Sequence, residues 1–139
     1  MTTSFVLDAW AILALLQKEE PAASRVLQLL QEANTQGFKL YVSIINLGEV
    51  YYRIGRIKGR KEADETLKSL YQLPVTILPA TDQIVLEAAS LKMELAISYA
   101  DAFAAAETQR LKATLVTGDP ELISLKGVIQ IEKLKRMRK

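Results

Sequence analysis

Short apolar runs alternate with longer stretches of helical periodicity along the chain. The apolar runs predict strands at residues 4–7, 38–42, 75–78, 113–117 and 128–131. The stretches between them predict helices at residues 9–17, 21–36, 44–58, 60–73, 81–95 and 100–112, and a short helix from residue 120. Strands that alternate with helices build a parallel sheet covered on both faces. We therefore expect an α/β fold, a three-layer α/β/α sandwich with a central parallel sheet of about five strands.

A chain of 139 residues fits one domain, and no internal repeat or long linker divides it. Its end differs in charge: the last eight residues, EKLKRMRK, carry five cations and one anion, whereas the whole chain has a net charge of +2. We expect a single domain over residues 1–131 and a basic C-terminal tail over residues 132–139. Because the charge is placed so unevenly, the net charge alone indicates no partner.

The most apolar segment, AWAILALL at Ala9–Leu16, is too short for a membrane span, which needs about 20 apolar residues. Asp8 precedes it and no basic segment does, so a signal peptide is not expected. The absence of cysteine is consistent with a reducing compartment. We expect a cytoplasmic protein with no membrane partner.

The chain contains no cysteine and no histidine, which excludes several kinds of catalytic site. Without cysteine there is no thiol nucleophile, disulfide or cysteine-based zinc site. Without histidine there is no serine–histidine triad and no histidine ligand for a transition metal. An enzyme of this composition would have to use carboxylates, lysine, hydroxyl groups or a cation bound by oxygen atoms.

Four acidic residues fall where the predicted sheet would bind a ligand. Asp8 follows the first expected strand and Asp119 follows the fourth. Asp101 and Glu49 lie in the first turns of expected helices, whose N-termini face the same edge. In open parallel sheets, ligands bind beyond the carboxyl ends of the strands. The pattern predicts that all four carboxylates reach one end of the sheet.

Each acid also has a local explanation. The aspartates after the strands suit N-cap positions, Ser98 and Asp101 fit a capping box, and Glu49 stands four residues before Arg53 as a favourable ion pair. If the carboxylates instead meet, two of them about 5 Å apart repel by roughly 3 kcal/mol at an effective dielectric of 20. A divalent cation relieves such repulsion, and oxygen ligands favour Mg²⁺ or Mn²⁺. This chemistry suits phosphodiester hydrolysis by a cation-activated water.

The four acids and their flanking segments resemble the PIN domain, in particular the small VapC-type toxin ribonucleases. The matching segments, in chain order, are VLDAWAILALL, VSIINLGEVYY, SYADAFAAAET and LVTGDPEL. The resemblance implies a Mg²⁺- or Mn²⁺-dependent endoribonuclease in which Asp8, Glu49, Asp101 and Asp119 are the catalytic and metal-binding residues. It also implies an RNA substrate, an antitoxin protein partner that occludes the pocket, and a homodimer.

Several neighbours of the four acids have roles that the sequence leaves open. Asn46, one turn before Glu49, orients that acid or makes an ordinary helix contact, and Thr117 supports the pocket or bonds locally. Many relatives carry a hydroxyl residue where this chain has Ala9, so the support of Asp8 is uncertain. Trp10 is a core residue or part of an interface.

RNA binding would require cations beside the acids, and the stretch RIGRIKGRK at Arg53–Lys61 is the best candidate. Its simpler interpretation is a solvated helix face. Tyr51 and Tyr52 can stack on bases, although helical spacing makes one of them core.

Three other functions are alternatives to the ribonuclease. A catalytically silent PIN-like module that binds RNA or protein has the same fold. A receiver-like phosphoacceptor domain fits poorly, because Asp8 stands alone after the first strand and the third strand exits into Pro79. A haloacid-dehalogenase-type phosphatase needs a second aspartate where this chain has Trp10.

Overall fold

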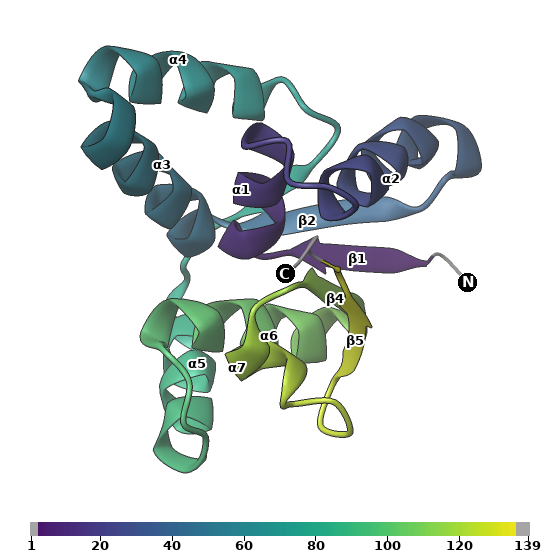
Figure 1. Ribbon diagram of the computed structural model, residues 1–139. Helices are drawn as coiled ribbons and strands as arrows, with labels where there is room; N and C mark the ends of the chain where they lie inside the picture. Colours follow the sequence, from purple (N-terminus) through teal and green to yellow (C-terminus); the bar gives the residue numbers. More distant parts are fainter. Residues whose placement is uncertain (1–2, 136–139) are drawn as a thin grey trace.

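The computed structural model of the protein describes residues 3–135, which form an α/β fold around one parallel sheet (Figure 1). The strands are β1 Ser4–Leu7, β2 Lys39–Ser43, β3 Thr76–Leu78, β4 Thr114–Thr117 and β5 Gln130–Lys133. They lie in the order β3–β2–β1–β4–β5, and every neighbouring pair is parallel. The expected fold class and the expected parallel sheet are therefore confirmed.

Helices cover both faces of this sheet. They are α1 Ala9–Leu16, α2 Ala22–Gln36, α3 Ile44–Lys58, α4 Arg60–Tyr71, α5 Asp82–Glu94, α6 Tyr99–Leu111 and α7 Pro120–Ile123. Figure 1 shows α1 to α4 on one side of the sheet and α5 to α7 on the other. Within residues 3–135, none of the helices has the length and hydropathy that crossing a bilayer requires.

Alternate residues of the central strand belong to two separate hydrophobic cores. Val6 of β1 packs with Leu115 and with the alanine-rich α6, whereas Leu7 packs with residues of α1, α2 and α3 on the other face. Residues 101–108 of α6 are all buried. A helix that is buried on nearly all sides needs no polar face, which explains why the sequence of α6 has little amphipathic pattern.

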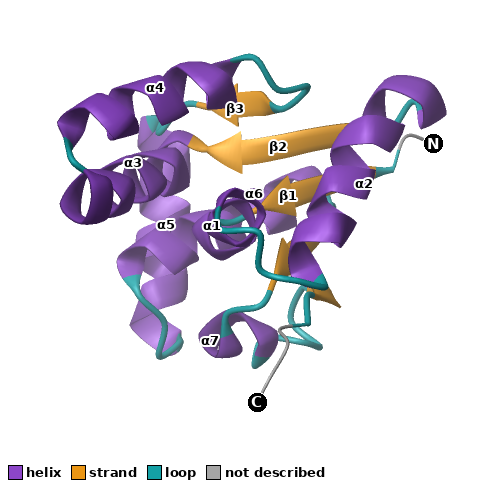
Figure 2. Cartoon of the chain, turned by 45° about the horizontal axis from the view of Figure 1, so that its top comes forward, coloured by secondary structure: helices purple, strands orange, loops and turns teal. Residues whose placement is uncertain are grey.

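Three strands end side by side and lead at once into helices. Asp8 follows β1 and caps α1, Ser43 ends β2 and caps α3, and Asp119 follows β4 and caps α7. Leu7 pairs with Val116, so the ends of β1 and β4 are level. Figure 2 shows the arrowhead of β2 pointing toward α3. The fold thus collects several helix N-termini at one edge of the sheet, as the sequence predicts.

The largest difference from the predicted elements is at the C-terminal end. The expected strand at 128–131 is wrong by two residues, because the chain turns at Gly127, where φ is +108°, and β5 begins only at residue 130. Glu132 and Lys133, assigned to the tail by the sequence, lie in β5, and Glu132 forms a salt bridge of 2.6 Å with Arg25 of α2. Leu134 is buried. Residues 136–139 of the expected tail lie outside the described residues.

Candidate functional site

The four acids selected from the sequence come together at the edge where β1, β2 and β4 end. Asp8 lies close enough to Glu49 and Asp119, and Asp101 close enough to Asp8 and Asp119, for their charges to interact. An open cleft of about 760 Å³ lies beside them. Glu49, Asp101 and Asp119 line this cleft together with Glu121, whereas Asp8 is buried.

Asp8 is held by hydrogen bonds to both of its carboxylate oxygens. The backbone N–H of Ala11 donates to Oδ1 at 2.8 Å, which makes Asp8 the N-cap of α1. The hydroxyl of Thr117 donates to Oδ2 and accepts a hydrogen bond of 3.0 Å from the backbone N–H of Asp119. The buried Thr117 side chain therefore links the end of β1 to the loop after β4 and supports two of the acids.

The carboxylates of Asp101, Asp119 and Glu121 form the tightest acidic group. One oxygen from each lies within 4.8 Å of the others. Asp119 accepts from the backbone N–H of Glu121 at 2.9 Å, and Glu121 accepts from the backbone N–H of Ser98 at 3.3 Å. The loop before α6 and the start of α7 thus hold the group from two sides.

Glu49 and Asn46 project from successive turns of α3. Within the described residues, the buried oxygens Glu49 Oε1 and Asn46 Oδ1 have no hydrogen-bond partner. Glu49 Oε2 lies 3.1 Å from the guanidinium of Arg53. Asn46 Nδ2 donates to the carbonyl of Ala100 at 3.1 Å, so this side chain ties α3 to the start of α6 instead of orienting Glu49.

The electrostatics of the site oppose ionisation of its two least exposed acids. Burial raises the pKa of Asp8 from 3.8 to about 7, against the hydrogen bonds from Thr117 and Ala11, which lower it. Burial raises the pKa of Asp101 to about 8, and the charges of Asp119 and Asp8 add to this shift. The fold therefore concentrates carboxylates where they are costly to ionise, and a pocket of this kind is a candidate functional site.

These residues fit a hard divalent cation. The donor set contains only oxygen atoms, which Mg²⁺ and Mn²⁺ prefer, and several carboxylates converge within the range of one ion. The unpartnered buried oxygen of Glu49 is a free acceptor beside them. A bound cation would relieve the repulsion that raises the pKa of Asp101.

The local explanations hold for three of the four acids: Asp8 and Asp119 cap helices, and Glu49 pairs with Arg53. The expected capping box is only half formed, because Ser98 accepts from the N–H of Asp101 whereas its own N–H donates to Glu121 and not to Asp101. Capping uses part of the Asp8 and Asp119 carboxylates and fixes their positions, so capping and clustering coexist.

Glu121 is the site residue that the sequence reasoning missed. It stands two residues after Asp119 and immediately after Pro120, at the start of α7. An acid in the first turn of a short helix is common because it offsets the helix dipole, which conceals any further role. Its spacing from Asp119 was the available signal.

The expected basic stretch contributes to the cleft through its first residue, Arg53, which lines it. Arg56 stacks on the ring of Tyr52 at 5.3 Å from the ring centroid. Tyr51 is partly buried and packs against the core, whereas Tyr52 is 49% exposed, so neither of the two is a fully buried core residue.

Comparison with known proteins gives a family and a set of similar folds. A family model described as PIN domain matches residues 5–128 of the chain. No curated protein sequence matches it.

Three solved structures with similar folds come from bacterial toxin–antitoxin systems. VapBC2 from Rickettsia felis, bound to a promoter DNA fragment, has a TM-score of 0.74 at 16% identity, over 96% of this chain and 100% of that one. DNA-bound VapBC from Salmonella typhimurium has a TM-score of 0.70 at 19% identity, over 96% and 98%. VapC20 from Mycobacterium tuberculosis, a toxin that cleaves the sarcin–ricin loop, has a TM-score of 0.71 at 14% identity, over 97% and 99%. At these identities the likeness establishes the fold.

Proposed function

The chain belongs to the PIN domain family, and from this premise we propose that it is a metal-dependent endoribonuclease and the toxin of a toxin–antitoxin pair. The convergence of Asp8, Glu49, Asp101 and Asp119 at one edge of the sheet carries the proposal. The composition agrees with this proposal, because an enzyme without histidine or cysteine would have to rely on groups such as carboxylates.

In this proposal, Asp101, Asp119 and Glu49 hold a Mg²⁺ or Mn²⁺ ion, and Asp8 completes the site from its buried position. When bound, the cation supplies positive charge that polarises the phosphodiester and offsets charge on the leaving oxygen. Thr117 holds Asp8 and the loop that carries Asp119 in fixed positions through its two hydrogen bonds. Arg53, which is half exposed beside Glu49, attracts the RNA backbone toward an otherwise acidic cleft.

The proposed partners are RNA, an antitoxin and a second copy of the chain. The similarity to VapBC structures supports an antitoxin that covers the cleft. We expect an equimolar antitoxin to abolish cleavage, and sedimentation of the purified chain to give the mass of a dimer.

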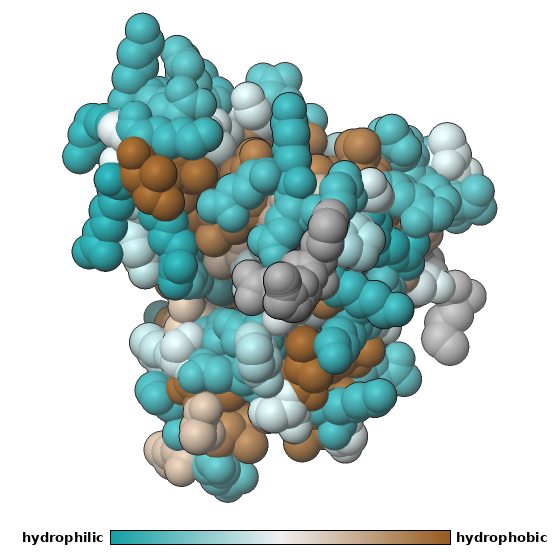
Figure 3. Space-filling view, viewed as in Figure 1, coloured by the Kyte–Doolittle hydropathy of each residue, from teal (hydrophilic) through white to brown (hydrophobic). Residues whose placement is uncertain are grey.

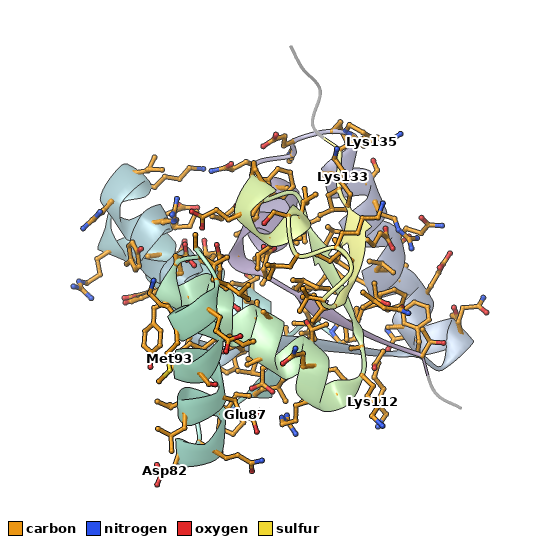
Figure 4. All side chains as sticks on the ribbon, turned by 90° about the horizontal axis from the view of Figure 1, so that it is seen from below. Asp82, Glu87, Met93, Lys112, Lys133 and Lys135 are labelled. Atoms are coloured by element: carbon orange, nitrogen blue, oxygen red, sulfur yellow. The ribbon has the colours of Figure 1, made fainter. Side chains whose placement is uncertain are left out.

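The direct test is RNA cleavage by the purified protein. Total cellular RNA should be fragmented in the presence of Mg²⁺ or Mn²⁺ and remain intact in excess chelator. Asp101→Asn should lower the rate about a hundredfold or more, because it removes a charged oxygen from the proposed cation site. Asp82→Asn is the matched control: this aspartate is exposed at the start of α5 and does not line the cleft (Figure 4).

Two outcomes would contradict the proposal. One is cleavage that persists in chelator, and the other is an Asp101→Asn variant as active as Asp82→Asn. A folded protein that binds RNA without cutting it, and binds no Mg²⁺ or Mn²⁺ by calorimetry, would instead indicate the catalytically silent binding module.

A further inference from the structure

Tyr52 stands where three hollows of the surface meet. It lines the acidic cleft, a second cleft of about 470 Å³ between α1 and α3, and a third of about 250 Å³ between α3 and α4. Arg53 lines the first two hollows, and Arg56 lines the second and third. The three side chains therefore form a continuous path that leads from the acids along α3.

The chemistry of this path changes with distance from the acids. Glu49 to Arg56 spans two helical turns, about 10 Å along the helix axis. The first turn pairs Glu49 with Arg53 at 3.1 Å, and the next places the guanidinium of Arg56 over the face of Tyr52. An exposed aromatic ring backed by an arginine offers a stacking surface and a positive charge at one place.

The second cleft combines apolar side chains with an aromatic ring and arginine side chains. Trp10, Leu13 and Ile57 contribute apolar surface to it, and Ile57 is 71% exposed. Figure 3 shows hydrophilic residues over most of the visible face, with hydrophobic residues in small separate patches, one of them near α3. Such a mixture of apolar wall, aromatic ring and arginine is typical of single-stranded nucleic acid sites.

We propose that Tyr52 and Arg56 form a platform that binds a nucleotide next to the one cut in the acidic cleft, with the base stacked on Tyr52 and the phosphate beside Arg56. The platform rests on the proposed ribonuclease function and deepens it, because it assigns two residues of this chain to a nucleotide that is bound but not cut. A duplex keeps its bases stacked inside the helix and cannot offer one to an exposed ring.

A protein segment is the competing occupant of the α1–α3 cleft. An apolar helix would use the walls made by Leu13 and Ile57. It would gain little from the guanidinium of Arg56 stacked on Tyr52, which is better matched to a phosphate and a base. The lining of the α1–α3 cleft therefore favours RNA over a protein segment.

The test measures binding and cleavage separately, with a fluorescein-labelled single-stranded RNA of mixed sequence and a hairpin of the same composition. Binding is measured by anisotropy on the Asp101→Asn background, so that cleavage does not interfere. Tyr52→Ala should weaken binding of the single strand about tenfold, the usual loss of one stacked base, whereas Tyr52→Phe keeps the ring and should bind as the parent does. Arg56→Gln should reduce the slope of log affinity against log salt by about 0.7, the value for one phosphate contact in a single strand.

Cleavage provides the second readout. With Asp101 intact, Tyr52→Ala should raise KM and leave kcat nearly unchanged, because the platform binds RNA away from the reacting atoms. Tyr71→Ala and Lys112→Asn are the controls. Tyr71 is 58% exposed and lines none of the three hollows, and Lys112 lies at the opposite end of α6 (Figure 4), where asparagine tolerates its left-handed backbone.

The outcomes distinguish this inference from the proposed function. If the parent cleaves RNA but Tyr52→Ala and Arg56→Gln bind and cut like the two controls, the platform is wrong and the ribonuclease stands. If the parent neither binds nor cuts RNA, both are wrong. If Tyr52→Ala leaves RNA binding unchanged but releases an antitoxin from a purified complex, the hollow belongs to a protein partner and the RNA platform is overturned.

Discussion

Replacement of Gly118 by alanine tests how tightly the loop that carries Asp119 is packed. A Cβ atom at position 118 would lie 2.4 Å from Cη2, 2.5 Å from Cζ3 and 2.6 Å from Cζ2 of Trp10. Carbon atoms pack favourably at about 3.5–4.0 Å, so one side of this contact must move by more than about 1 Å. The backbone of Gly118 is not in the left-handed region, and the cost of the substitution is therefore steric.

The loop resists this movement more than the indole does. The N–H of Asp119 is held by Thr117, and the carbonyl of Asp119 accepts from Leu122 and Ile123. The Trp10 ring borders the 470 Å³ cleft, so there is space on that side for the ring to turn. We expect Gly118→Ala to destabilise the protein by about 1–3 kcal/mol, as overpacking usually does. Trp10 should shift into the cleft.

Denaturant unfolding followed by circular dichroism measures this loss, and Trp10 is the only tryptophan, so its emission reports its exposure. Trp10→Phe removes the distal ring atoms that face Gly118. On that background, Gly118→Ala should cost nothing or stabilise slightly. Gly48→Ala is the control, because nothing lies within 4 Å of its Cβ position in α3, and it should stabilise the helix by up to about 1 kcal/mol. An equal loss from Gly118→Ala in both backgrounds would refute the reasoning.

The other predictions concern the acids and their supports. The folded-state pKa of Asp8 is about 7 and its unfolded value is 3.8, so the folded chain keeps the Asp8 proton to higher pH than the unfolded chain does. In chelator, Asp8 should therefore contribute a fall of about 4 kcal/mol in the free energy of unfolding as pH rises from 4 to 8, and Asp101, whose pKa is also raised, should add to that fall. Urea midpoints across this range measure the fall, which Asp8→Asn should reduce. Thr117→Val, which leaves the buried Asp8 oxygen and the partly buried N–H of Asp119 unpaired, should cost about 1–3 kcal/mol, whereas Thr117→Ser keeps the hydroxyl and should cost less; thermal melts compare them. Glu121→Gln should weaken Mn²⁺ binding in calorimetry less than Asp101→Asn does, because Glu121 is exposed and Asp101 is buried.

Much of the fold was predictable because single residues mark where its helices begin and end. Gly37 ends α2 in a left-handed conformation, and Gly59 separates α3 from α4. Thr81 and Ser98 cap the next two helices through their hydroxyls. The misplaced strand was β5, whose exposed residues Gln130 and Lys133 lack an apolar signal, because an edge strand buries only part of its surface.

The part of the candidate site that follows from the order and direction of the strands was predictable. Carboxyl ends of parallel strands meet at one edge, and that rule alone brings Asp8 and Asp119 together. The rule does not specify hydrogen-bond partners, so the pairing of Asn46 with Ala100 was missed. The contact of Trp10 with Gly118 joins residues that are far apart in sequence. It depends on tertiary packing, which the hydrophobic pattern of the sequence does not predict.

The capping roles of the aspartates strengthen the case for a function that uses charge. Asparagine caps a helix about as well as aspartate, and it carries no charge that burial or a neighbouring acid makes unfavourable. For the fold alone, asparagine at Asp8 would keep the hydrogen bond from Ala11 and would carry no charge, so it would avoid the cost of ionisation that raises the pKa of Asp8 to about 7. The chain instead has acids at Asp8, Asp101 and Asp119, where the charge of Asp119 opposes ionisation of both Asp8 and Asp101. Local structure explains why polar side chains stand at these positions, but not why they are ionisable, and the proposed cation-dependent reaction would supply that reason.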